Sequence, residues 1–157
     1  QAPLPQRLGG QRTLIMNVPG LRSPHEKTGG LVYFGRMIDK IRLQASLSLP
    51  EDYIANLGAG FDLRCVRLLG VSYSELADQV RSHPNATDEE LLAWCNQHGR
   101  TPDAEQIDVW NECMRKRGWN DDLSERLQQR LAEGGFAHRT DIQTFFDYID
   151  LDEGRRH

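Results

Sequence analysis

Apolar residues recur three and four positions apart along most of the chain, a spacing that predicts amphipathic α-helices. No segment of useful length alternates between apolar and polar residues, so no substantial sheet is expected. The sequence therefore predicts an all-α fold, a compact bundle of six to seven short helices. The expected helices cover about residues 31–47, 60–69, 73–82, 88–98, 102–117, 122–133 and 141–151, with a short helical turn near 52–57.

Three threonines are expected to cap helices. Thr87 is followed three positions later by Glu90, and Thr140 is followed in the same way by Gln143. This spacing is typical of a capping box, in which the two side chains satisfy free amides at the helix start. Thr101 precedes a proline, a residue that suits the first helical position. We therefore expect a helix to begin directly after each of these threonines.

The first predicted helix, in the stretch "GLVYFGRMIDKIRL", carries charge among its apolar residues. Its main apolar face comprises Leu31, Phe34, Ile38, Ile41 and Ala45. Its opposite, polar face comprises Tyr33, Lys40 and Gln44. Between these faces, Arg36 and Asp39 share a second apolar strip with Val32 and Leu43. A helix that is apolar on two sides is central in its domain or covered by a partner.

Five charged residues on this helix and the next form the candidate ligand-binding site. An isolated buried ion is very costly, so these groups must pair with one another or bind something charged. Three interpretations remain open: an internal salt-bridge cluster that ties the two helices together, a site for a small anionic ligand, and a protein interface. The candidate residues are Arg36, Asp39, Lys40, Asp62 and Arg64.

The cysteines and histidines form no pattern typical of a metal or catalytic site. Cys65, Cys95 and Cys113 include no CxxC pair, and the five histidines have neither HxxxH nor HExxH spacing. We therefore expect no metal and no cofactor. No catalytic motif is recognisable, so the sequence leans against an enzyme without deciding the question.

A net charge of −4 argues against nucleic-acid binding, which depends on the neutralisation of phosphates. One basic cluster, residues 115–117, precedes Trp119, and RNA binding with this ring as a stacking platform is the weakest hypothesis. Asp121 and Asp122 follow directly and oppose it. Cations also suit the end of a helix, where they offset its dipole, and this explanation suffices for the cluster.

The composition, 38% hydrophobic and 27% charged, is typical of a globular protein. No run approaches 18 apolar residues, so neither a transmembrane helix nor a membrane partner is expected. The first residues lack the apolar core of a signal peptide, and we expect a cytoplasmic protein. Residues 1–15 are expected to be an extension before a natural start at Met16, and residues 16–157 a single helical domain.

Four separated blocks carry a family resemblance: "LRSPHEKTGGLVYFGRMIDKIRL", "FDLRCVRLLGV", "TDEELLAW" and "VWNECMRKRGWND". In this order they resemble the bacterial family called domain of unknown function 5069. The resemblance runs from about Val18 to Arg155. It implies a bacterial, soluble, stand-alone domain and assigns no activity, cofactor or substrate to any residue.

Two functions therefore remain open. The first is a soluble domain that binds a small anionic ligand at the charged cluster between the first two helices. The alternative is a non-enzymatic protein-interaction module, either a homo-oligomer or a subunit of a larger assembly, with Val32 and Leu43 in its interface.

Overall fold

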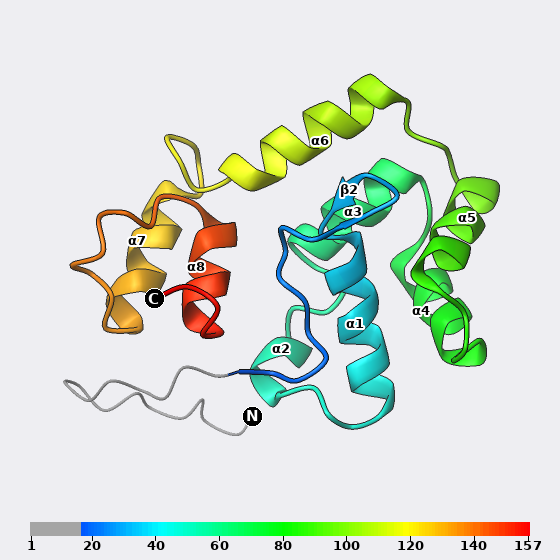
Figure 1. Cartoon of the computed structure of the whole chain (residues 1–157), viewed down its shortest axis with the longest axis horizontal. Helices are drawn as coiled ribbons and strands as arrows, with labels where there is room; N and C mark the ends of the chain where they lie inside the picture. Colours follow the sequence, from blue (N-terminus) through cyan, green and yellow to red (C-terminus); the bar gives the residue numbers. More distant parts are fainter. Residues whose placement is uncertain (1–16) are drawn as a thin grey trace. The chain divides into compact units, whose positions relative to one another are not determined.

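The computed structural model describes residues 17–157, so the extension expected over residues 1–15 and the expected start at Met16 lie outside the described residues. The described chain is mostly helical, which confirms the predicted all-α class (Figure 1). None of its helices is both long and apolar enough to cross a bilayer. Its elements are β1 (Lys27–Thr28), β2 (Leu31–Val32), α1 (Phe34–Ala45), α2 (Glu51–Ile54), α3 (Phe61–Leu69), α4 (Tyr73–Ser82), α5 (Asp88–His98), α6 (Ala104–Lys116), α7 (Ser124–Glu133) and α8 (Phe145–Asp152).

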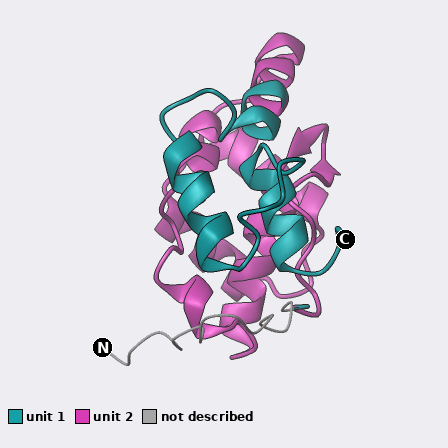
Figure 2. Ribbon diagram, turned by 90° about the vertical axis from the view of Figure 1, so that its left-hand side faces the viewer, with its two compact units in different colours: residues 1–17, 112–157 teal, residues 18–111 magenta. Residues whose placement is uncertain are grey.

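Contacts divide the described chain into two units, which Figure 2 colours separately. The N-terminal unit, Val18–Asn111, contains the two strands, α1 to α5 and most of α6. The C-terminal unit, Glu112–His157, contains the end of α6 with α7 and α8. The expectation of one domain over residues 16–157 stays a prediction.

A small hairpin precedes α1. Its strands are antiparallel, with Lys27 opposite Val32. Gly29 and Gly30 form the turn with φ angles of +55° and +84°, and two positive angles in succession are typical of a tight hairpin turn. The helix predicted from residue 31 therefore begins only at Phe34, which corrects the sequence prediction. The apolar spacing misled because residues buried in a short hairpin can match a helical period.

Side chains of α6 hold this hairpin. The indole Nε1 of Trp110 donates to the carbonyl of Val32 at 3.1 Å. The Asn111 amide accepts from the Val32 N–H at 3.0 Å and donates to the Gly30 carbonyl at 2.8 Å. Buried backbone groups of a two-stranded sheet need such partners, because an unpaired buried polar group is costly. The clamp fixes the backbone directly before α1.

The C-terminus of α1 is also shorter than predicted. The helix ends at Ala45 rather than near residue 47, and Leu47 has a left-handed φ of +58°. Leu47 N–H donates to the Gln44 carbonyl, and Ser48 N–H donates to the Leu43 carbonyl. This pair of bonds is typical of a Schellman motif, whose left-handed residue ends a helix.

Of the three caps predicted at threonines, one is confirmed. Thr87 and Glu90 form the predicted capping box at the start of α5. The prediction at Thr101 is wrong, because Asp103 and Gln106 bond reciprocally and α6 begins at Ala104. The prediction at residue 140 is also wrong: Thr144 accepts from the Asp147 N–H, and α8 begins at Phe145. In both failures another side-chain acceptor lies directly before the first residue of the helix.

Each unit has its own buried apolar residues. Every fully buried leucine or phenylalanine contributes about 1.5–3 kcal/mol relative to an exposed one. In the N-terminal unit, the largest fully buried residues are Leu31, Phe34, Met37, Ile38, Ile41, Leu69, Leu76 and Leu91. In the C-terminal unit, the cluster comprises Leu127, Leu131, Phe136, Ile142 and Leu151.

Candidate ligand-binding site

A closed cluster of three polar side chains joins α1 to α3. The Lys40 ammonium lies 2.7 Å from the Oδ1 atom of Asp62 and 3.0 Å from the Tyr33 hydroxyl. The Tyr33 hydroxyl donates to the same Asp62 oxygen at 2.5 Å. The Asp62 side chain is fully buried and that of Lys40 is 8% exposed. We call these three residues the buried triad.

The backbone builds the triad from two unusual turns. Tyr33 has a left-handed φ of +75°, which is uncommon for a bulky residue, and it lies between β2 and α1. Gly58, with φ +75°, donates its N–H to the second Asp62 oxygen at 3.0 Å. Both Asp62 oxygens are therefore hydrogen-bonded, as a buried carboxylate requires.

The protonation of the triad follows from its burial. Burial first, and the Asp62 carboxylate second, raise the pKa of Tyr33 well above its ordinary value. The phenol therefore stays neutral and donates. Burial and the same carboxylate also raise the pKa of the Cys65 thiol. The Lys40 ammonium and the Asp62 carboxylate offset each other's charge, so the triad needs no bound ion. The Cys65 thiol, buried and with a raised pKa, is a poor nucleophile.

A second tyrosine lies near Asp62 without such a partner. The Tyr73 hydroxyl is buried and makes no hydrogen bond. Burial, followed by the charge of Asp62, raises the pKa of Tyr73 to about 12. Tyr33, within the triad, donates to Asp62. Tyr73, outside the triad, has a buried hydroxyl without a hydrogen bond.

A second set of charges lies along α1 and is only partly buried. The Arg22 side chain donates to both Asp39 oxygens, at 2.8 and 2.9 Å, and pairs with Asp88 at 2.7 Å. Arg42 donates to the other Asp88 oxygen at 2.8 Å and to the Ala86 carbonyl at 2.7 Å. These side chains are 9–33% exposed. We call Arg22, Asp39, Arg42 and Asp88 the open ion-pair network.

Gly35 makes this network possible. A Cβ atom at this position would lie 2.8 Å from the Arg22 guanidinium, so a larger residue would displace the arginine from its present place against α1. Arg22 also donates to the Gly35 carbonyl at 3.0 Å. The hydrogen bond to Asp39 is the main cause that raises the pKa of Arg22, which keeps its charge in place.

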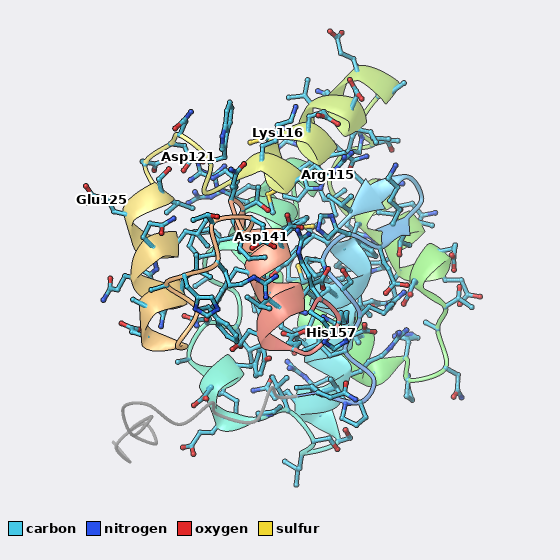
Figure 3. All side chains as sticks on the ribbon, turned by 60° about the vertical axis from the view of Figure 1, so that its left-hand side comes forward. Arg115, Lys116, Asp121, Glu125, Asp141 and His157 are labelled. Carbon is cyan, nitrogen blue, oxygen red and sulfur yellow. The ribbon has the colours of Figure 1, made fainter. Side chains whose placement is uncertain are left out.

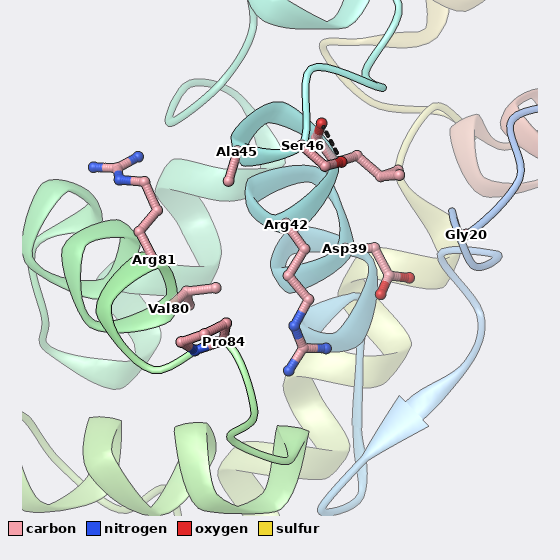
Figure 4. A pocket seen from close by; sticks show the side chains of 9 residues that line it. Gly20, Asp39, Arg42, Ala45, Ser46, Val80, Arg81 and Pro84 are labelled. Carbon is pink, nitrogen blue, oxygen red and sulfur yellow. Dashed lines mark hydrogen bonds between the residues drawn. The ribbon is translucent and has the colours of Figure 1, made fainter.

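A pocket of about 460 Å³ lies beside the open ion-pair network. Its volume falls within the range of about 300–1,000 Å³ that is usual for small-molecule sites. In Figure 4 the Arg42 head lies beside α1, whereas the Arg81 head extends away from α1. The side chains that line it from α1 are Asp39, Arg42, Leu43 and Ala45, and from α4 and its end Val80, Arg81 and Pro84.

A scan against protein families matches residues 18–155 to the domain of unknown function DUF5069. The chain belongs to the DUF5069 family. A comparison with curated proteins gives no match. The family description names no activity, so the interpretation of this DUF5069 domain depends on its own residues.

The domain divides the five predicted site residues among different surroundings. Lys40 and Asp62 meet in the buried triad. Asp39 belongs to the open ion-pair network, and Arg36 donates to the Arg22 carbonyl at 3.0 Å. Arg64 is exposed on α3. The five therefore do not share one cavity, and the face of the first helix predicted to be polar is buried at Tyr33 and Lys40.

Four residues of these sites were not singled out from the sequence: Tyr33 as a triad member, Arg22, Asp88 and Arg81. Except for Arg81, which pairs with Asp78 three positions away, their contacts join residues far apart in sequence, for example 46 positions between Arg42 and Asp88. No spacing rule identifies such pairs. The one available signal was Gly35 inside a helix, where it is unfavourable by about 1 kcal/mol relative to alanine.

The C-terminal unit contains the basic cluster, and Figure 3 labels Arg115, Lys116 and Asp121. Both Arg115 and Lys116 pair with Glu112. Arg117 pairs with Asp121 and Asp122. Each cation thus has a carboxylate partner within its own unit, which leaves little free positive charge for phosphates.

Trp119, next to this cluster, is 53% exposed. Asp121 orders the surrounding turn, because it accepts from the N–H groups of Gly118 and Leu123.

Among residues 17–157 no group of histidine, cysteine and acidic side chains has the arrangement of a metal site.

Proposed function

We propose that this DUF5069 domain binds a small anionic molecule with an apolar part in the pocket beside α1. The observation that carries the proposal is the position of Arg42. Its guanidinium is oriented by Asp88 and the Ala86 carbonyl, and it lines a pocket whose other walls include Leu43 and Val80. The sequence predicts an anionic ligand between α1 and α3. The proposal keeps this class of ligand but places its site between α1 and α4.

Arg42 can bind an anion without leaving its present partners. Arginine has five N–H donors. Two of its nitrogens, Nη1 and Nη2, each make one hydrogen bond, and three N–H groups therefore remain. A charge-assisted bond from one of them to an anion is worth about 1.5–3 kcal/mol. The buried triad offers no comparable opening, because Lys40 and Asp62 already satisfy each other.

Asp39, the predicted site residue that also lines the pocket, has a supporting role in this proposal. Its carboxylate accepts from the backbone N–H and the side chain of Arg22. That pairing offsets its negative charge, so Asp39 does not repel an anion held by Arg42 as a free carboxylate would. We propose a cytoplasmic bacterial protein that binds its ligand without a catalytic step.

The test is a thermal-shift screen of anionic metabolites with the full chain and two matched variants. Ala45→Phe fills the pocket from the exposed end of α1 and leaves the ion pairs intact. Ala132→Phe adds the same ring on the exposed side of α7. A ligand at about 100 times its Kd stabilises the native state by about 2.7 kcal/mol. We expect the shift in wild type and Ala132→Phe and its loss in Ala45→Phe; equal shifts in all three would contradict the proposal.

One observation favours the alternative, a protein-interaction module. Trp119 is half exposed on an ordered turn, and tryptophan is enriched among residues that dominate binding energy at interfaces. The interface suggested at Val32 has less support, since Val32 is fully buried in β2. Co-purification with wild type and Trp119→Ser distinguishes the alternatives: a partner lost only in Trp119→Ser, without any ligand response, would favour the interaction module.

A further inference from the structure

The charged groups around the pocket are paired, and their charges balance. Arg22, Arg42 and Arg81 contribute three cations, and Asp39 and Asp88 contribute two partly buried anions. Asp78 contributes the third anion, because it pairs with Arg81 at 2.7 Å. A site with no excess positive charge offsets one negative charge more readily than two, so a monoanion suits it better than a dianion.

Two helix C-termini lie at the same pocket. Ala45 is the last residue of α1, and Arg81 lies in the last turn of α4. A helix C-terminus has a partial negative charge of about half an electron, which disfavours anions nearby. A dianion such as a phosphate monoester meets this repulsion twice as strongly as a monoanion. The arginines at both ends offset it only in part.

The available donors favour a flat anionic group. The Arg42 guanidinium is planar and fixed at two of its nitrogens, and its other N–H groups lie in the same plane. A carboxylate matches two parallel N–H groups of such a fork. Beyond this head lie the apolar side chains of Leu43, Val80 and Pro84, with Ala45 at the exposed end.

We infer that the ligand of this pocket is a monocarboxylate with an apolar body, whose carboxylate binds Arg42 and whose body packs against Leu43 and Val80. The inference rests on the proposed function and narrows its ligand class. The guanidinium of Arg81 extends away from α1 (Figure 4), so Arg81 attracts the carboxylate only at long range.

The experiment compares four probes in NMR titrations of the full, isotope-labelled chain. Phenylacetate has the inferred carboxylate and body, whereas 2-phenylethanol keeps the body without charge. Acetate keeps only the carboxylate. Phenyl phosphate keeps a ring and is a dianion above pH 7, since a phosphate monoester has its second pKa near 6. We expect phenylacetate to bind with a millimolar Kd, at least about tenfold tighter than the other three.

The outcomes separate the two proposals. Phenyl phosphate binding as tightly as phenylacetate would overturn the inference and leave the proposed anion site intact. Binding of 2-phenylethanol with equal affinity, or no shift with any probe, would overturn the proposed function and the inference with it. Shifts at amides outside residues 39–46 and 80–84 would also contradict both.

Two variants test the role of the planar fork. Arg42→Lys keeps the charge and loses the fork, so phenylacetate should bind about tenfold more weakly. Arg64→Lys makes the same change at the exposed position on α3 and should leave the affinity unchanged. If Arg42→Lys does not fold, Ala45→Phe provides the test, because it must abolish the shifts while its unfolding midpoint stays near that of wild type. Unchanged affinity in Arg42→Lys would contradict the inference.

Discussion

The buried triad and the open ion-pair network both involve α1, yet they differ in what surrounds their charges. In the triad, Asp62 is fully buried and Lys40 nearly so, the two charges pair with each other, and Gly58 bonds the second Asp62 oxygen. In the network, the arginines are about one-third exposed and keep unused donors. The triad therefore holds α1 against α3, whereas Arg42 of the network can add a ligand to its present partners.

This difference explains why the candidate site lies beside Arg42 and not beside Lys40. A buried ion pair loses several kcal/mol when one partner is removed, because the other charge remains uncompensated in a dry site. A ligand that competed for Lys40 would have to overcome that penalty. Arg42 is one-third exposed and keeps unused donors, so it can form a new bond when an anion arrives.

The largest effect is expected for the loss of the triad carboxylate. Asp62→Asn leaves the Lys40 ammonium buried without its counter-charge and should reduce the free energy of unfolding by about 3–5 kcal/mol. Urea denaturation measures the change. The double variant Lys40→Met with Asp62→Asn should lose less free energy of unfolding than the two single variants lose together, because neither buried charge remains. Additive losses would show that the two charges do not interact.

Removal of one hydroxyl from the triad should have a smaller effect. Tyr33→Phe removes the donor to Asp62 and the acceptor for Lys40, and we expect a loss of about 1–3 kcal/mol in the free energy of unfolding. The same change at Tyr53, a partly exposed tyrosine of α2, is the control. A loss in Tyr33→Phe no larger than in the control would contradict a stabilising role for the phenol.

The same change at Tyr73 should have the opposite sign. Its buried hydroxyl makes no hydrogen bond, so Tyr73→Phe removes an unsatisfied group and should raise the free energy of unfolding by about 1 kcal/mol. Denaturation of Tyr33→Phe and Tyr73→Phe side by side gives the comparison. A loss of stability in Tyr73→Phe would show that this hydroxyl has a partner in solution.

Alkaline pH provides a second measurement on Tyr73. Its pKa is raised to about 12 in the folded state, whereas an unfolded tyrosine has a pKa of about 10. The folded state thus holds its proton more tightly, so the stability present below pH 10 is lost as the pH rises from 10 through 12. The free energy of unfolding of Tyr73→Phe should therefore decrease less steeply with pH between 10 and 12 than that of wild type. Identical pH profiles would contradict the raised pKa.

The sequence predicted elements best where local signals were complete. Helix α4 was predicted at its observed bounds, and the Thr87–Glu90 box marks the start of α5. The start of α8 was missed because Thr140 with Gln143 has the spacing of a cap but forms none, while Thr144 does. Spacing alone does not reveal which of two candidates lies next to the first buried turn. The Asp103–Gln106 pair at α6 was visible in the sequence and could have been found.

The candidate site was less predictable, for a physical reason. Helical periodicity placed Tyr33 and Lys40 on one side of the first helix, and the structure does place them together. A salt-bridge cluster between the two helices was one expected interpretation, and Lys40 with Asp62 forms such a pair. Periodicity did not show that Tyr33 would be buried with them, because burial depends on contacts between distant segments. Arg22 reaches Asp39 across 17 positions from a segment without regular structure. No pattern within the helix predicts that partner.

The smallest effect is expected in the open ion-pair network, and it should depend on salt. Asp88→Asn removes the carboxylate shared by Arg22 and Arg42 and a favourable charge in the first turn of α5, so about 1 kcal/mol of stability should be lost at low ionic strength. In 1 M NaCl the Debye length falls to about 3 Å, and most of this difference should disappear. Asp62→Asn should keep its full deficit in the same salt, since its surroundings exclude ions. Urea denaturation of both variants at the two salt concentrations measures these losses of stability. A parallel decrease of the two losses in salt would contradict the contrast between the clusters.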